Sequence, residues 1–461
     1  MSDQIQQAIQ SSTRTVGANP STAILPWHRR EDTWAVLIAL GLVLGVTLAF
    51  FLGGGRAVSA TALSIPTWSD GATLVGALTA NPFAPLALFG LFLAAFSGAS
   101  LVLGWNVARY AAGFALLFAF SLVVTALGSN ASLKQWQLET PLLALAVGIV
   151  LGNAVKLPDW FRSALRTEFY VKVGIVLMGA TLPFTIILQA GPLAIAQATI
   201  VAVTTFVAIY LAATRLFGLD PRFGATLGAG GSICGVSAAI AIGGACRAEK
   251  SHVSIAISMV VLWAVAMIFA LPVACRFLGL APGVAGAWIG TSEFADAAGF
   301  AAAATLGDER AVTTFTLMKV VGRDMFVGVW AIVVAFLAVT RWERGSLGPV
   351  ERVGLGELWR RFPRFILGFL AASLIVTVIL ASVDSTIGTR YASDAIGPLK
   401  TLRGWAFAWT FLSIGFTTRF RELTRFGWRP FAAFAVGVLV NVPLGYWLST
   451  TVFESYWLAV K

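Results

Sequence analysis

The sequence predicts an all-α polytopic membrane protein of about 11–13 transmembrane segments, and three observations support this fold class. Of its 461 residues, 58% are hydrophobic and only 11% are charged, against about 25% charged residues in soluble proteins. So few polar residues cannot cover the surface of a soluble domain. The apolar residues form continuous runs close to the ~20 residues that cross a bilayer. These runs do not alternate as the strands of a membrane barrel do, so helices are expected.

Thirteen apolar runs are the candidate spans, and two of them, 222–246 and 283–305, are unusually rich in small residues. We expect a polar tail over 1–32, a single transmembrane domain over 33–453 and a short C-terminal tail over 454–461. The runs in chain order are 33–52, 85–104, 107–127, 141–154, 171–190, 193–215, 222–246, 252–275, 283–305, 311–340, 363–383, 401–418 and 428–453.

The positive charges predict how these runs are oriented. If the N-terminus is cytoplasmic and every run crosses, 21 Lys and Arg residues fall inside and nine outside, as the positive-inside rule favours. We therefore expect a multi-pass protein of the plasma (inner) membrane, whose net charge of +11 requires no nucleic acid. Arg247 and Lys250 fall on the wrong side, which is explained if 222–246 is a broken or re-entrant segment.

An internal likeness predicts an inverted repeat. At a constant offset of 236 residues, four pairs are identical: Gly179/Gly415, Thr181/Thr417, Phe184/Phe420 and Gly191/Gly427. The two motifs lie seven crossings apart, so they point in opposite directions, as in many secondary transporters. Chance is the alternative, because Gly and Phe are common here. A weaker likeness relates Gly231-Ser232 to Gly290-Thr291, and the relative direction of those segments stays open.

The stretch 227–239 is the most informative part of the chain. It holds four glycines within eight residues, each of which destabilises a helix by about 1 kcal/mol relative to Ala. Backbone unwinds inside a membrane only where it is buried in protein or lines a cavity. A helix that resumes after such a break offers free N–H groups and a positive dipole end to an anion. Close helix packing through small residues is the alternative.

This stretch resembles the signature of the YeiH family, whose members are labelled sulfate exporters. The matching residues are Gly231-Ser-Ile-Cys-Gly235-x-Ser-Ala, Glu249, Pro272, Lys172-x-Gly174-Ile175-x-Leu177-x-Gly179, Gly290-Thr-Ser292, Lys319 with Arg323, and Leu412-Ser-Ile-Gly415-Phe-x-Thr417. The likeness covers roughly 141–453. Family members often carry a histidine soon after the equivalent of Gly290, whereas this chain has Glu293, Phe294 and Asp296. The resemblance implies inverted repeats and broken crossing helices, similar to those of the bile acid–sodium symporter superfamily.

Five charged residues stand out because they lie well inside the apolar runs rather than at their ends; inside a run each costs ~2.5–3.5 kcal/mol and is a functional candidate. Glu293 and Asp296 are three residues apart and Lys319 and Arg323 four apart, so each pair shares one face of a helix; Asp324 is adjacent. We expect the two bases to attract an anionic substrate and one of the acids to carry a coupling proton. A static ion-pair network, or anchoring of a long helix at the interface, is the alternative.

The predicted function is secondary active export of a small anion, for which the resemblance suggests sulfate or a related sulfur oxyanion. The alternative is an organic-anion importer of the bile acid symporter-like type, coupled to protons or sodium. An enzyme is disfavoured and no cofactor or metal is expected, because two histidines and three scattered cysteines form no catalytic or metal-binding motif. Substrate identity, direction, coupling ion and oligomeric state stay open. The predicted substrate-binding residues are Gly230, Gly231, Ser232, Cys234, Gly235, Ser237, Thr291, Ser292, Lys319 and Arg323, with coupling through Glu293 and Asp296.

Overall fold

The structure is a computed structural model, and it describes residues 29–55, 58, 61–135, 140–324, 333–334, 364–418 and 427–460. Most of these residues are helical, and no strand occurs among them. Seven of the described helices are long and apolar enough to cross a membrane. The predicted class, an all-α polytopic membrane protein, is therefore confirmed. Most of the predicted tail 1–32, the end of the run 311–340 and Phe420 of the repeat lie outside the described residues.

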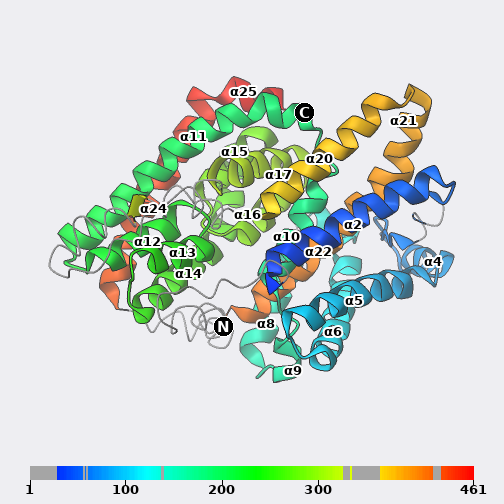
Figure 1. The fold of residues 1–461 in the computed structure, drawn as a ribbon, viewed down its shortest axis with the longest axis horizontal. Helices are drawn as coiled ribbons and strands as arrows, with labels where there is room; N and C mark the ends of the chain where they lie inside the picture. Colours follow the sequence, from blue (N-terminus) through cyan, green and yellow to red (C-terminus); the bar gives the residue numbers. More distant parts are fainter. Residues whose placement is uncertain are drawn as a thin grey trace. The chain divides into compact units, whose positions relative to one another are not determined.

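The helices, many of which are labelled in Figure 1, form two compact units. Unit 2 contains α2 (Glu31–Phe51), α4 (Gly71–Ala80), α5 (Ala84–Leu103), α6 (Val107–Gly128), α7 (Ala131–Gln135), α8 (Thr140–Ala154), α9 (Asp159–Arg162), α10 (Thr167–Gly179), α20 (Arg364–Ser382), α21 (Ser385–Tyr391), η5 (Ala392–Ile396) and α22 (Gly397–Thr417). Unit 1 contains α11 (Phe184–Leu211, from Leu188 on), η2 (Ala212–Leu216), α12 (Pro221–Ser232), α13 (Val236–Ala245), α14 (Lys250–Phe277), α15 (Pro282–Ser292), α16 (Asp296–Ala304), α17 (Glu309–Thr316), η3 (Leu317–Arg323), α24 (Trp428–Trp447), η6 (Leu448–Val452) and α25 (Glu454–Ala459).

In unit 2, α10 and α22 run in opposite directions, as the offset of 236 residues predicts. The ring of Phe407 closes over Gly174. One turn further along α10 and one turn back along α22, the Arg403 guanidinium lies 2.8 Å from the Met178 sulfur. Arg403 also donates to the Thr181 hydroxyl at 2.8 Å. The two helices that carry the repeat motif, α10 and α22, therefore pack against each other antiparallel.

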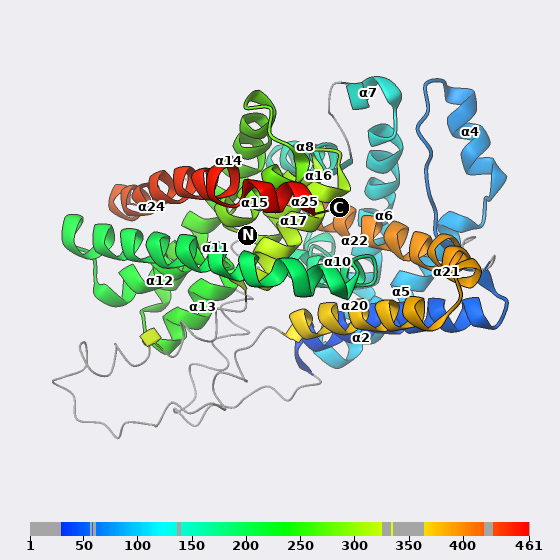
Figure 2. The ribbon, with the colours of Figure 1, turned by 90° about the horizontal axis from the view of Figure 1, so that it is seen from above.

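In unit 1, α11 and α24 form a second antiparallel pair, drawn in green and in orange to red in Figure 2. Gln197 donates to the Ser449 hydroxyl at 2.7 Å, and Asn441 donates to the Thr205 hydroxyl at 2.9 Å. From Gln197 to Thr205 the chain advances eight residues along α11, whereas their partners go back eight residues, from Ser449 in η6 to Asn441 in α24. The two helices are therefore antiparallel. Thr205 and Asn441 are themselves 236 residues apart, so equivalent positions of the repeat meet on a local two-fold axis.

Two boundaries differ from the prediction. The run 171–190 is not one helix, because α10 ends at Gly179 and α11 begins at Phe184. Pro183 lies just before α11, and its missing N–H suits the start of a helix. The segment after 453 is also more than a tail, since α25 packs into unit 1. Its Trp457 is fully buried and donates to the side-chain oxygen of Gln197 at 2.8 Å.

Candidate functional site

The run 222–246 is a helical hairpin, here called the first hairpin (residues 221–245). The hairpin breaks between Ser232, the last residue of α12, and Val236, the first of α13. The second arm returns along the first, because the Cys246 thiol contacts the Arg222 carbonyl oxygen at 3.7 Å and Arg222 donates to the Arg247 carbonyl at 3.5 Å. Both ends of the hairpin therefore lie together, which agrees with the expectation of a broken or re-entrant segment.

The run 283–305 forms the second hairpin (residues 282–304). Its first arm, α15, ends at Ser292, and its second arm, α16, begins at Asp296. Arg276, near the end of the helix that precedes the hairpin, donates to the carbonyl of Thr305, which follows the hairpin directly. This hairpin therefore also returns to the end from which it started.

The two hairpins enter unit 1 from opposite ends of the α11–α24 pair. The first starts after Phe217, whose ring centroid lies 5.6 Å from that of Trp428 at the start of α24. The second starts at the other end, where Gly283 lies against the carbonyl of Trp457. Near the middle, Asn441 donates to the Thr291 carbonyl at 3.1 Å. The two segments of the weaker sequence likeness, at Gly231 and Gly290, therefore lie next to the breaks of the two hairpins. These two breaks face each other from opposite directions.

Gly235 is the point where the two tips touch. Its φ of +72° is a left-handed conformation that side chains rarely adopt. A side chain there would also overlap the carbonyl oxygen of Phe294 in the second tip. Glycine is therefore required at 235 both by the backbone conformation and by the close approach.

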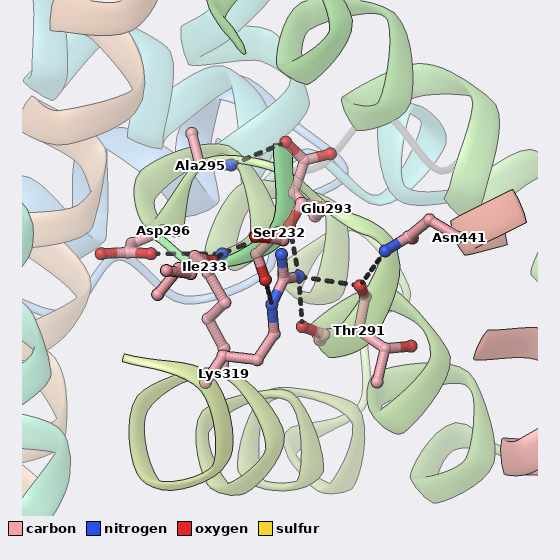
Figure 3. A network of polar contacts seen from close by, with 10 residues as sticks. Ser232, Ile233, Thr291, Glu293, Ala295, Asp296, Lys319 and Asn441 are labelled. Carbon is pink, nitrogen blue, oxygen red and sulfur yellow. Dashed lines mark hydrogen bonds and ion pairs between the residues drawn. The ribbon is translucent and has the colours of Figure 1, made fainter. Parts of the chain in front are cut away.

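Arg323 links both tips by hydrogen bonds to backbone carbonyls, among them those of Ser232, Thr291 and Glu293, which are labelled in Figure 3. The last carbonyls of a helix have no partner within it and form the negative end of its dipole. Here the ends of α12 and α15 converge on one fully buried guanidinium. It donates through Nε to Ser232 O at 3.2 Å, and through Nη1 to Gly290 O at 3.1 Å, Thr291 O at 2.8 Å and Glu293 O at 2.9 Å.

Lys319 makes the second link between the tips. Its ammonium donates to Ile233 O at 2.9 Å and to Glu293 O at 3.3 Å, and lies 3.5 Å from a carboxylate oxygen of Asp296. The lysine side chain is fully buried. Both predicted anion-binding cations therefore have backbone partners. Among the described residues, the Arg323 Nη2 donor and the Ser232 hydroxyl have no hydrogen-bond partner.

Among the residues that the structure describes, three buried carboxyl groups and two buried cations lie around the tips. Glu293 is fully buried, and its Oε1 accepts from the Ala295 amide at 3.3 Å. Its Oε2 has no hydrogen-bond partner within the described parts of the chain. Asp296 and Asp324 are buried close by. With Lys319 and Arg323, the group carries one net negative charge when every member is ionised and none when one carboxyl is protonated.

The positive ends of the two second arms differ. Asp296 stands in the first turn of α16 and compensates its dipole. The first turn of α13 has no acidic residue and no side-chain cap among the described residues. Ser237 in that turn is exposed, and the neighbouring Val236 is half-buried. The accessible, uncompensated helix end at this crossing is therefore that of α13.

The structure brings all the predicted site residues to the tips of the two hairpins. Cys234 lies in the first break, and Gly230 and Gly231 precede it, packed against Val260 and Ile209 respectively. Ser292 ends α15. The sequence reasoning did not single out Asn441 as a site residue, and the structure places it beside the Thr205 hydroxyl and the Thr291 carbonyl.

A second omission is Arg403, which the charge count treated only as one of the nine positive residues outside. The structure buries it in unit 2, against Thr181. Hydropathy counts carried no signal for this burial, because they do not show which helix face a charge occupies.

The comparisons with known proteins agree with this architecture. The family described as "Conserved hypothetical protein 698" matches residues 112–434. A UPF0324 membrane protein of Rhodopirellula baltica is 32% identical over 82% of this chain and 71% of its own length. A second, from Nitratidesulfovibrio vulgaris, is 30% identical over 78% of this chain and 62% of its own length.

A third relative, the UPF0324 membrane protein of Nitrosomonas europaea, is 29% identical over 87% of this chain and 90% of its own length. No solved structure matches the chain. The family match covers more than half of the chain and includes both hairpins, α10 and α22. The chain therefore belongs to the UPF0324, or YeiH, family of membrane proteins.

Proposed function

We propose that this protein is a secondary active transporter of a small anion. The observation that carries the proposal is the meeting of two hairpins, from opposite ends of unit 1, at tips that hold buried charges. Irregular backbone at membrane depth is tolerated where it is buried in protein or lines a pathway. Discontinuous helices that meet near the middle of the bilayer are a common way to build a transport site.

The anion site that we propose is the N-terminal end of α13. Its free N–H groups and the exposed hydroxyl of Ser237 suit an oxyanion, which accepts hydrogen bonds at a helix N-terminus. Lys319 and Arg323 contribute positive potential from behind the tips, while their donors hold the carbonyls. Sulfate or a related sulfur oxyanion is the substrate that the family resemblance suggests, and the direction that it suggests is export.

The carboxyl groups at the tips support coupling to protons. An added anion would raise the negative charge of a group that already carries one net negative charge when fully ionised. Protonation of Glu293, whose Oε2 has no hydrogen-bond partner among the described residues, would remove that excess. We therefore propose that the anion and a proton move together, with Glu293 as the carrier and Asp296 as the second candidate.

The hairpins also refine the proposed orientation in the plasma membrane. If neither hairpin crosses, Arg247 and Lys250 move to the cytoplasmic side of the predicted map and Arg276 moves to the outside. The bias then becomes 22 positive residues inside and eight outside, which strengthens the case for a cytoplasmic N-terminus. Protease digestion of an N-terminal tag in intact cells and in inverted vesicles tests this placement.

Efflux from proteoliposomes tests the function. Vesicles would be loaded with labelled sulfate, sulfite, thiosulfate or a small sulfonate, with an outward gradient. We expect at least one anion to leave faster than from empty liposomes. Ser237→Ala should slow it, whereas Ser251→Ala on the exposed start of α14 should not. If no anion in the panel moves, the proposed class is wrong.

The alternative function, a cation-coupled importer of organic anions, rests on the same two carboxyl groups. It predicts uptake that depends on a sodium or proton gradient and that is lost in Glu293→Gln or Asp296→Asn. Replacing the sodium gradient by a choline gradient at constant pH separates the two coupling ions. Uptake that needs the sodium gradient would favour the importer over proton-coupled export.

A further inference from the structure

We propose that the Lys319 ammonium occupies a monovalent-cation position built by the two hairpin tips, so that the wild-type protein needs no sodium there. Replacing this side chain by a small one should turn the position into a cation-binding site. The inference concerns the same tips as the proposed function, but it does not depend on anion transport.

The oxygen atoms around the ammonium are those that a hard cation uses. Ile233 O, from the first tip, lies at 2.9 Å, and Glu293 O, from the second, at 3.3 Å. A carboxylate oxygen of Asp296 lies at 3.5 Å. Sodium and calcium are bound by such sets of backbone carbonyls and carboxylates. In broken membrane helices, unwound carbonyls and half-helix C-termini commonly supply them.

The surrounding charge also requires a cation at this position. The C-terminal ends of α12 and α15 converge here, and each carries about half a negative charge. The nearest acid, Asp296, is only 10% exposed at its side chain, so water provides little compensation. Arg323 also lies against these helix ends, but without Lys319 the buried carboxylate of Asp296 would lose the cation that lies 3.5 Å from it and would be strongly destabilised.

Lys319, rather than Arg323, is the residue that an ion could replace. A lysine ammonium is a compact point charge, whereas an arginine guanidinium is a planar fork. Arg323 spreads over four carbonyls, those of Ser232, Gly290, Thr291 and Glu293. One monovalent ion cannot span that set, but it can take the single point where the Lys319 nitrogen lies.

Thermal unfolding of the purified protein in detergent tests the proposal. Wild type, Lys319→Ala and Lys319→Met would be titrated with sodium, lithium and potassium chloride, with choline chloride at constant ionic strength. Lys319→Ala opens space for an ion, whereas Lys319→Met fills it without a charge. At a concentration roughly ten times the dissociation constant, the melting temperature of Lys319→Ala should rise by about 1.5 °C. The wild type and Lys319→Met should show no saturable rise.

Lys172→Ala is the matched control from unit 2. Lys172 lies 2.7 Å from Asp32 and 3.5 Å from Glu168, but these partners are partly exposed carboxylates and include no hairpin carbonyl. Its variant should gain no cation-specific stabilisation. Lys319→Ser, which leaves a hydroxyl as an additional ligand, is the second test variant and should gain the same stabilisation as Lys319→Ala.

Three results would overturn the inference. The first is saturable sodium stabilisation of the wild type. The second is an equal cation response in Lys319→Met, which has no room for the ion. The third is that neither Lys319→Ala nor Lys319→Ser is stabilised or restored by any of the three cations. These readouts involve no anion, so their failure is distinct from a failure of the proteoliposome assay.

Discussion

The two hairpins have the same architecture and different chemistry. Each consists of two short helical arms and a break of three residues, at 233–235 in the first and 293–295 in the second. The first break contains Gly235 and no charged residue. The second contains Glu293 and is followed by Asp296. The first tip is therefore shaped by backbone freedom, while the second brings the acidic groups to the meeting point.

This difference assigns separate tasks to the two tips. The α16 dipole is compensated by Asp296 within its own first turn, whereas the α13 dipole has no acid of its own and has the exposed Ser237 beside it. An anion is therefore expected at the first tip and a proton at the second. Arg323 and Lys319 donate hydrogen bonds to carbonyls of both tips. We therefore expect anion binding at the first tip to change proton binding at the second.

The largest expected effect comes from Arg323→Ala, which removes the guanidinium that donates hydrogen bonds to both hairpins. Four buried carbonyl oxygens would lose their charged donor, and we expect a loss of about 3–5 kcal/mol in the free energy of unfolding. Thermal unfolding in detergent measures it. Arg310→Ala, at an exposed arginine paired with Asp308, should change stability little. If the two variants are equally stable, Arg323 does not hold the tips together.

The next largest effect compares a glycine that the first tip requires, Gly235, with one that it does not require, Gly244. Gly235→Ala introduces a side chain at a positive φ and against Phe294 O, and should cost about 2–4 kcal/mol. In the same hairpin, a Cβ at the exposed Gly244 meets nothing within 4 Å. Gly244→Ala should stabilise the protein by about 0.5–1 kcal/mol. Chemical denaturation of both variants measures the contrast, and effects of the same sign would contradict it.

Ser237→Asp would make the first tip resemble the second. The new carboxylate compensates the α13 dipole and repels an anion, so the KM for the transported anion should rise about tenfold, equivalent to about 1.4 kcal/mol. Stability should be unchanged or slightly higher. Ser237→Asn is the neutral control and should transport nearly as the wild type does. Equal KM values for both variants would show that the anion binds elsewhere.

The smallest effect concerns the residues that follow each hairpin. The chain leaves the first hairpin through Arg247, with a φ of +54°, and the second through Gly307, with a φ of +73°. Arg247→Gly should therefore stabilise the protein by about 1 kcal/mol, and Gly307→Ala should destabilise it by a similar amount. Melting temperatures measure both. If Arg247→Gly instead lowers the melting temperature, contacts of the arginine side chain outweigh its backbone strain.

The first hairpin was far easier to predict from the sequence than the second. The glycines of 227–239 lower helix propensity locally, so a break there follows from the residues themselves. The break at 293–295 reads Glu-Phe-Ala and contains no helix breaker. Its Glu293 carbonyl accepts hydrogen bonds from both Lys319 and Arg323, and such a tertiary cause leaves no local pattern.

The partners of the buried cations could not be predicted for a related reason. The charge pattern identified Lys319 and Arg323, but their acceptors are backbone carbonyls, which every residue possesses and no pattern distinguishes. The start of α11, by contrast, could have been predicted, because Pro183 is a typical signal for the start of a helix. Hydropathy alone merged the residues on both sides of it into one run, 171–190.

The burial of Trp457 has a consequence for the order in which this protein is assembled during synthesis. The first hairpin packs mainly on α11 and α14, which directly precede and follow it, and its Gly231 also lies against Phe434 of α24. The base of the second lies against Trp457, about 150 residues later, which is roughly 8–30 s of translation at 5–20 residues per second. The second hairpin must therefore wait for the end of the chain before its packing is complete. A ribosome that stalls late leaves an acidic, unsupported hairpin in the membrane.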